Sequence, residues 1–217
     1  MKVECVALGP FETNCYLVID DTGKRCVVVD APAGAGTHVL AEIRERGLVL
    51  EALFLTHGHW DHMSDAADFA LPGVAVYAHK DDHVCYDTPE RFKTWYQMIV
   101  PDLTDDDFRP VKVTRWVEQG STLEVLDRVF EVRHVPGHCP GNILFYCASE
   151  KIAFTGDTLF AGSVGRSDLP GGNWPMLLKS IRNQIYTLPD DTILFPGHGP
   201  ETTVGAEKLA NPYARPE

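Results

Sequence analysis

The stretch THGHWDHMSD, which begins at Thr56, follows the apolar run ALFL at residues 52–55. Within six positions it concentrates three imidazoles and one carboxylate: His57, His59, Asp61 and His62. One histidine alone is more often structural than metal-binding, but imidazole and carboxylate together are the ligands that zinc, iron and manganese take. So many ligand-type residues directly after a buried strand predict a metal site. The fold must then place the end of this strand at that site.

The spacing within this stretch divides the four side chains into two groups. His57 and His59 are two positions apart, so they face the same side of an extended segment. Asp61 and His62 can turn toward a second metal only if the chain bends there into a turn or helix, which the following Ser-Asp pair favours. The spacing therefore predicts ligands for two metals rather than one.

Three further ligand-type residues come just after apolar strands. The segment HVPGHCPG carries His138, IAFTGDTLF carries Asp157, and ILFPGHGP carries His198. Each could be a simple turn residue, since Gly-Asp-Thr and Gly-His-Gly are turn sequences. Strand ends placed side by side in a sheet would bring all of them to the first motif, and a carboxylate such as Asp157 could then bridge two metals.

Composition narrows the class of ligand. The chain has 217 residues, of which 44% are hydrophobic and 23% charged, and its formal net charge is −12. That charge repels nucleic acid and anionic membranes, so we expect neither as a partner and expect a small-molecule substrate instead. No apolar run approaches the roughly 20 residues that span a bilayer.

The cysteines and the N-terminus predict the compartment. The six cysteines show no CxxC spacing, which argues against a zinc ribbon or a thioredoxin-like site. The first residues alternate like a strand and lack the features of a signal peptide. We therefore expect reduced thiols and a cytoplasmic protein.

Hydrophobic periodicity predicts an α/β fold in a single domain, residues 1–217. Strands are predicted at 3–8, 14–19, 25–30, 52–56, 74–79, 122–126, 129–135, 142–147 and 151–156, with a last strand and turn at 192–199. Helices are predicted at 37–47, 64–70 and 173–188, and the later half loosely echoes the earlier one, which suggests two similar sheet halves. Residues 80–118 include a candidate helix at 91–100 and an acidic loop, and they form either a flap near the site or a decoration of the edge.

In this order, HGHWDH at 57–62 followed by His138, Asp157 and His198 resembles the motif set of the metallo-β-lactamase superfamily. The resemblance runs from about residue 3 to about residue 213, and it implies an αββα sandwich with a dinuclear metal site at one edge. It implies that His57, His59 and His138 hold one metal. Asp61, His62 and His198 would hold the other, and Asp157 would bridge.

Within the superfamily, TGDTLFAGSVGRSDLPGGN (155–173) and PGHGPETTVGAEKLANPY (196–213) resemble short glyoxalase II-like members. This implies a thioesterase that cleaves a substrate such as S-D-lactoylglutathione by attack of a metal-bridging hydroxide, with Asp61 and Asp157 as catalytic residues. The expected cofactors are two divalent ions, zinc first and iron or manganese as alternatives. Full-length enzymes of that branch carry a further helical domain, and Cys139 replaces their usual Thr or Ser.

Substrate contacts are less constrained by the sequence. Arg166 could clamp a substrate carboxylate or pair with Asp168, and His79 ends a strand on the same side as the site. The alternatives are a mononuclear iron persulfide dioxygenase, a lactone or ester hydrolase, and a non-catalytic metal-binding protein. The acyl group, the thiol carrier and the oligomeric state are not assigned by the sequence.

Overall fold

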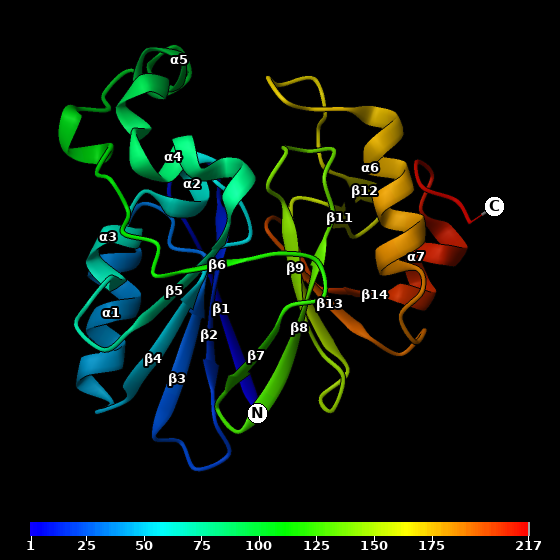
Figure 1. The fold of residues 1–217 in the computed structure, drawn as a ribbon, viewed down its shortest axis with the longest axis horizontal. Coiled ribbons are helices and arrows are strands. Elements are labelled where there is room, and N and C mark those ends of the chain that lie inside the picture. Colours follow the sequence, from blue (N-terminus) through cyan, green and yellow to red (C-terminus); the bar gives the residue numbers. More distant parts are fainter. Residues whose placement is uncertain (217) are drawn as a thin grey trace. The chain divides into compact units, whose positions relative to one another are not determined.

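A computed structural model describes residues 1–216, which belong to two compact units, Met1–Trp116 and Val117–Glu217 (Figure 1). Each unit is built around a six-stranded sheet with helices packed on one face. The predicted α/β class and the two sheet halves are therefore confirmed. No helix in the described residues has both the length and the apolar character needed to cross a membrane.

The first sheet has the strand order β1-β2-β3-β4-β5-β6. Its strands are β1 (Lys2–Leu8), β2 (Thr13–Ile19), β3 (Arg25–Val29), β4 (Val49–Phe54), β5 (Ala75–His79) and β6 (Arg115–Val117). Its unit also holds α1 (Ala35–Glu45), α2 (Trp60–Met63), α3 (Ala66–Phe69), α4 (His83–Asp87), α5 (Lys93–Gln97) and three short 3₁₀ turns, η1 (Lys80–Asp82), η2 (Pro89–Phe92) and η3 (Asp105–Asp107).

Parallel pairing decides where the loops of the first unit go. Strands β3, β4 and β5 run parallel, so their carboxyl ends lie at one edge of the sheet. Helix α1 provides the crossover from β3 to β4 and buries Val39, Leu40 and Ile43, the three apolar positions of the predicted helix, against the sheet. The loops after β3, β4 and β5 therefore meet at that edge.

The second sheet has the order β14-β13-β10-β9-β8-β7. Its strands are β7 (Thr122–Val125), β8 (Arg128–His134), β9 (Ile143–Cys147), β10 (Ile152–Gly156), β13 (Ile193–Pro196) and β14 (Thr202–Thr203), and a separate two-stranded ribbon is formed by β11 (Leu159–Phe160) and β12 (Ser163–Val164). Its helices are α6 (Trp174–Ser180), the π-helical turn η4 (Ile181–Ile185) and α7 (Val204–Ala210).

In the second sheet too, strand direction determines where the loops with ligand-type residues lie. Strand β9 is antiparallel to both β8 and β10, and β13 is parallel to β10, so β8, β10 and β13 all run the same way. The three loops that follow them carry His138, Asp157 and His198. One expectation needs correction here, because the four ligand-bearing strands do not share a sheet: β4 belongs to the first and the other three to the second.

Most element predictions are confirmed and a few are refined. The predicted helix at 64–70 is replaced by two single turns, α2 and α3, with the first beginning at Trp60. The predicted helix at 173–188 begins with Asn173 as its cap, whose side chain accepts from the Met176 amide, and changes to π-helical hydrogen bonding at Ile181. None of the six cysteines, which all lie in the described residues, forms a disulfide.

The loop after β8 approaches α6 so closely that only glycine is accommodated at one position. Gly137 has φ +134°, and a Cβ there would lie 2.3 Å from the main-chain nitrogen of Leu177. We predict that Gly137→Ala lowers the free energy of unfolding by roughly 1–3 kcal/mol from overpacking, in addition to the backbone strain. Gly162→Ala is the matched control, since φ is +68° there and nothing lies within 4 Å, so only about 1–2 kcal/mol of strain is expected. Urea unfolding of both variants measures the difference, and equal losses would contradict the close approach.

Candidate metal centre

In the first unit, the loop after β4 brings its ligand-type atoms together as the spacing predicts. His57 Nε2 lies 3.2 Å from His59 Nδ1, so these two imidazoles do face the same side. The chain then bends into α2 directly after His59, and His62 Nε2 lies 3.5 Å from Asp61 Oδ2. His57 and His62 are fully buried, and their ring centroids are 4.1 Å apart.

A buried carboxylate that sequence reasoning did not select organises this loop. Asp30 follows β3, has φ 57° and is 2% exposed. Its Oδ1 accepts a 2.8 Å hydrogen bond from the Thr56 amide, and its Oδ2 accepts one of 2.8 Å from the Thr56 hydroxyl. The same Oδ2 lies 2.8 Å from His62 Nδ1. Asp30 therefore ties the end of β3 to both ends of the ligand loop.

These contacts determine which nitrogen of each buried imidazole carries a proton. Both oxygens of Asp30 accept from Thr56, so at the 2.8 Å contact with Asp30 Oδ2 the donor is His62 Nδ1, and His62 Nε2 keeps its lone pair. The Thr56 hydroxyl donates its only proton to Asp30. At its 3.0 Å contact with His57 Nδ1 the hydroxyl must therefore accept, so the proton of His57 is on Nδ1 and the lone pair is on Nε2. Both rings thus hold the tautomer that a metal ligand needs, oriented by a second hydrogen bond as is usual for metal-binding histidines. The donor set of this loop therefore fits a divalent cation.

The remaining ligand-type residue of the loop and its backbone are also held in place. Asp61 Oδ2 accepts a 3.1 Å hydrogen bond from the Thr13 hydroxyl, donated by the start of β2. The Gly58 amide donates to Asp82 Oδ2 at 2.9 Å, and a Cβ at Gly58 would lie 2.6 Å from the Cβ of Cys85. The glycine between the first two histidines is therefore required by the packing of α4 against the loop.

In the second unit, the three strand-end residues converge on one carboxylate oxygen. Asp157 Oδ2 lies 3.6 Å from His138 Nε2 and 3.4 Å from His198 Nε2. His138 Nδ1 donates to the Arg166 carbonyl at 2.7 Å, so its Nε2 also presents a lone pair. An oxygen of Asp157 thus lies between two imidazoles, which is the placement that a bridging carboxylate requires.

Gly165 permits this arrangement and was not selected from the sequence. A Cβ at that position would lie 1.8 Å from the main-chain oxygen of Asp157 and 3.3 Å from His138 Nδ1. The chain directly after β12 therefore passes the two ligand-type residues at a distance that only glycine allows. No pattern in the sequence distinguishes Gly165 from the other glycines of the 155–173 segment.

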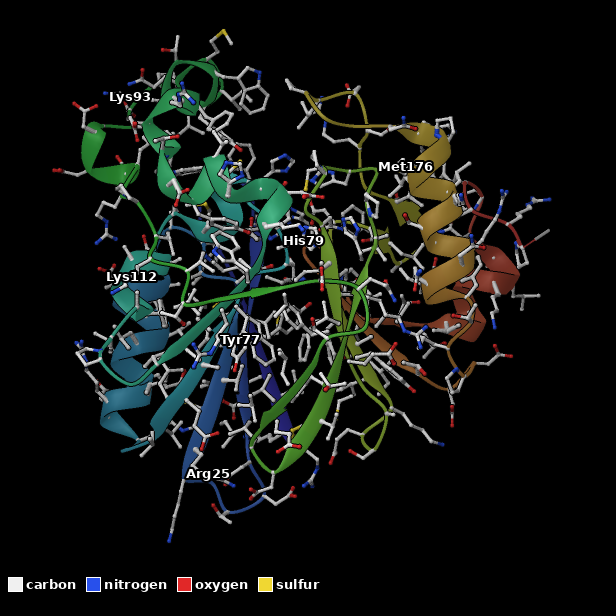
Figure 2. All side chains as sticks on the ribbon, viewed as in Figure 1. Arg25, Tyr77, His79, Lys93, Lys112 and Met176 are labelled. Carbon is white, nitrogen blue, oxygen red and sulfur yellow. The ribbon has the colours of Figure 1, made fainter. Side chains whose placement is uncertain are left out.

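The three residues expected to contact substrate lie in different settings. Arg166 forms a bidentate ion pair with Asp168, at 2.8 and 2.9 Å. The hydrogen bonds from Arg166 lower the pKa of the Asp168 carboxyl to about 2, so the pair is fully ionised at neutral pH. His79 ends β5 (Figure 2) and is 4% exposed, with Nδ1 accepting from the Asp81 amide. Cys139 is 3% exposed, as a packed small side chain would be.

Comparison with known proteins agrees with the fold. The family model of the metallo-beta-lactamase superfamily matches residues 8–198, and the chain belongs to this superfamily. It is 38% identical to the hydroxyacylglutathione hydrolase GloC of Haemophilus influenzae over 217 residues, 98% of each chain. The expected likeness to glyoxalase II-like members is thereby confirmed.

Two solved structures show the same fold. The B3 metallo-beta-lactamase BLEG-1 is 32% identical, with a TM-score of 0.83 over 98% of this chain and 99% of that one. The structure of TTHA1623 in a di-iron-bound form is 36% identical, with a TM-score of 0.81 over 97% of this chain and 99% of that one. The chain is thus a metallo-hydrolase of this superfamily with the metallo-β-lactamase fold.

Because Asp30 fixes the tautomer of His62, replacement of its carboxylate by an amide in Asp30→Asn should change that tautomer. Asparagine keeps the shape and tolerates the positive φ, but its amide group at the Oδ2 position donates and forces His62 Nδ1 to become the acceptor. The proton then moves to Nε2, and we expect metal affinity to fall about 10- to 100-fold. Imidazole ¹⁵N NMR reports the tautomer, and chelator competition reports the affinity. Asp20→Asn, at a buried carboxylate remote from the histidines in sequence, is the control, and an unchanged His62 tautomer in Asp30→Asn would refute the argument.

Proposed function

We propose that the seven ligand-type residues form one dinuclear metal centre that hydrolyses a thioester. The observation that carries the proposal is the locked tautomer of His57, His62 and His138, each of which commits its Nδ1 to an acceptor and leaves Nε2 as a ligand. Nothing in ordinary core packing requires three histidines to be held this way. Membership of the superfamily supports the pairing of the two ligand sets into one centre.

The proposed ligand assignment follows the family motif. By that motif, His57, His59 and His138 would hold one ion, Asp61, His62 and His198 would hold the other, and Asp157 would be shared between them. Bound ions of this kind ionise a water near neutral pH and polarise the carbonyl that it attacks. We propose zinc as the native metal, and the di-iron form of TTHA1623 supports iron as the alternative.

The chain's own groups account for the remaining requirements of the reaction. Thr13 holds Asp61 as an acceptor, so this carboxylate can orient a proton of the attacking water while it binds metal. The two carboxylates of the ligand set are both used, which leaves no spare carboxylic acid to protonate a leaving group. A thiolate leaves without such help, whereas an alkoxide or amine needs a general acid. The site is therefore better suited to a thioester than to a peptide.

The proposed substrate is supported by a relative whose name states an activity. GloC of Haemophilus influenzae is a hydroxyacylglutathione hydrolase, and we propose S-D-lactoylglutathione as the substrate class for this chain, with a cytoplasmic location. The test is release of free thiol from S-D-lactoylglutathione by protein loaded with two zinc or two iron ions. We expect turnover that chelator abolishes and added metal restores. Absence of turnover with both ions bound would reject this substrate.

Removal of the proposed bridge should remove both metal and activity. Asp157→Ala takes away the oxygen that lies between His138 and His198, so we expect bound metal to fall from two ions toward one and thiol release to fall by at least about 10³-fold, or ~4 kcal/mol. Asp191→Asn is the matched control, because it lies in the same unit in an exposed pair with Lys151. Metal analysis and kinetics are measured together. Asp157→Ala with two ions and wild-type turnover would exclude Asp157 as the bridge.

Arg166 offers a way to separate substrate binding from chemistry. Its side chain is 57% exposed and could exchange Asp168 for a substrate carboxylate, while its main-chain carbonyl still accepts from His138. We predict that Arg166→Ala raises KM about tenfold with little change in kcat or metal content, because the lost contact binds the substrate equally well in the ground state and in the transition state. Arg182→Ala in the same unit is the control. A fall in kcat at constant KM would instead indicate a role in the reaction step.

A β-lactam is the second candidate substrate, favoured by the likeness to BLEG-1. The hydrolysis of a chromogenic cephalosporin by the same metal-loaded protein tests it. A persulfide dioxygenase would instead need a single iron and consume oxygen, so metal count and oxygen uptake distinguish it from either hydrolase.

A further inference from the structure

The residue between the metal-ligand candidates, Trp60, is held by a segment far along the chain. Trp60 is the first residue of α2, and the amide of a first helical residue has no partner within its helix. The Tyr96 hydroxyl accepts from this amide at 3.0 Å. The Trp60 indole Nε1 donates to the main-chain oxygen of Asp107 at 2.7 Å. One hydrogen bond therefore fixes the backbone of Trp60, and a second one, to a different residue, fixes its ring.

Aromatic packing reinforces this attachment. The Trp60 ring lies 5.6 Å from that of Tyr96, 5.8 Å from that of Phe108 and 6.4 Å from that of Phe11. Trp60, Tyr96 and Phe108 are 3%, 7% and 4% exposed; the hydrogen bond to the Tyr96 hydroxyl is buried, and the one to the Asp107 carbonyl is part-buried. Breaking one of them would leave a buried polar group without its partner.

The segment that supplies these contacts is itself well braced. Lys93 (Figure 2) pairs with Asp105 at 2.5 Å, and the Gln97 amide donates to the Leu103 carbonyl at 2.7 Å. Thr104 and Asp107 form a reciprocal capping box around η3. Residues 93–108 therefore present the Tyr96 hydroxyl and the Asp107 carbonyl from a folded support. We call this support the bracket.

We propose that the bracket is a positioning element for the metal centre, with Tyr96 as its principal positioning residue acting through Trp60. This inference rests on the proposed function, since it concerns the same ligands. His59 caps α2 and Asp61 lies in its first turn, so the direction of both side chains depends on how the start of this helix is oriented. The bracket sets that orientation from outside the loop, as Asp30 does from inside the sheet.

A purely structural role for Tyr96 would predict a different result from a positioning role. If the hydroxyl only stabilised the fold, its removal would lower stability and leave the metal environment of the folded protein unchanged. If it positions ligands, the metal environment changes in the folded protein. The absorption spectrum of bound Co²⁺ distinguishes the two, because its visible bands depend on the directions and identities of the ligands rather than on stability.

The test uses the full chain with Co²⁺ as the probe. Tyr96→Phe removes the hydroxyl and keeps the ring. Tyr77→Phe is the matched control, because it also removes a tyrosine hydroxyl of the first unit but lies on β5, outside the bracket, with its ring against Phe54. For Tyr96→Phe we expect shifted Co²⁺ bands and about 10-fold weaker retention of metal against a chelator, the lower end of the range for groups that orient ligands. For Tyr77→Phe we expect the wild-type spectrum and affinity.

Trp60→Phe provides a second variant if Tyr96→Phe does not fold, since it removes the indole donor to Asp107 and keeps a smaller aromatic ring, while the amide that donates to Tyr96 stays. A wild-type spectrum in Tyr96→Phe, or an equal shift in Tyr77→Phe, would overturn the proposal. Failure to bind Co²⁺ in the wild-type chain would overturn both this proposal and the metal centre. Bound Co²⁺ with the expected shift but without thiol release would reject the thioesterase and leave the bracket supported.

Discussion

The ligand loop of the first unit depends on one buried acceptor, Asp30. A carboxylate that is 2% exposed is costly unless it is fully hydrogen-bonded, and here Thr56 and His62 supply its donors. The consequence is chemical as well as structural. Because Asp30 only accepts, it decides the tautomer of His62 directly and that of His57 through the Thr56 hydroxyl. A strand end therefore determines which atoms of two histidines are available to a metal.

Strand direction explains why the remaining residues gather where they do. Three parallel strands of the first sheet end in Asp30, the HGHWDH loop and His79, and three like-directed strands of the second end in His138, Asp157 and His198. Within each sheet, the shared direction of these strands brings the residues at their ends to the same edge. The close glycine contacts at Gly137 and Gly165 then allow the second set to approach its neighbours. In both units, therefore, the ligand-type residues are gathered at the carboxyl ends of the strands.

Much of this could be predicted from the sequence, and the remainder could not for identifiable reasons. Periodicity located the strands, and the spacing of His57 to His62 gave both the shared face and the bend. Asp30 was identifiable from the sequence, since it follows VVV at a strand end as the other ligand-type residues follow their strands. Tyr96 was not, because a contact across 36 residues leaves no local pattern. Gly165 was not, because its requirement comes from a distance to the Asp157 oxygen.

The position of Trp60 shows why a ligand loop benefits from an aromatic residue in its middle. A loop held only by its metals would be free to reorganise whenever they dissociate, and rebinding would bear the entropy of ordering it again. Trp60 places a large buried ring between His59 and Asp61, so the loop is anchored in the aromatic core whether or not metal is present. Asp30 anchors the same loop from the opposite direction. With both in place, the ligands are preorganised by packing and hydrogen bonds, and the binding free energy of the metals is available for metal selection rather than for folding the loop.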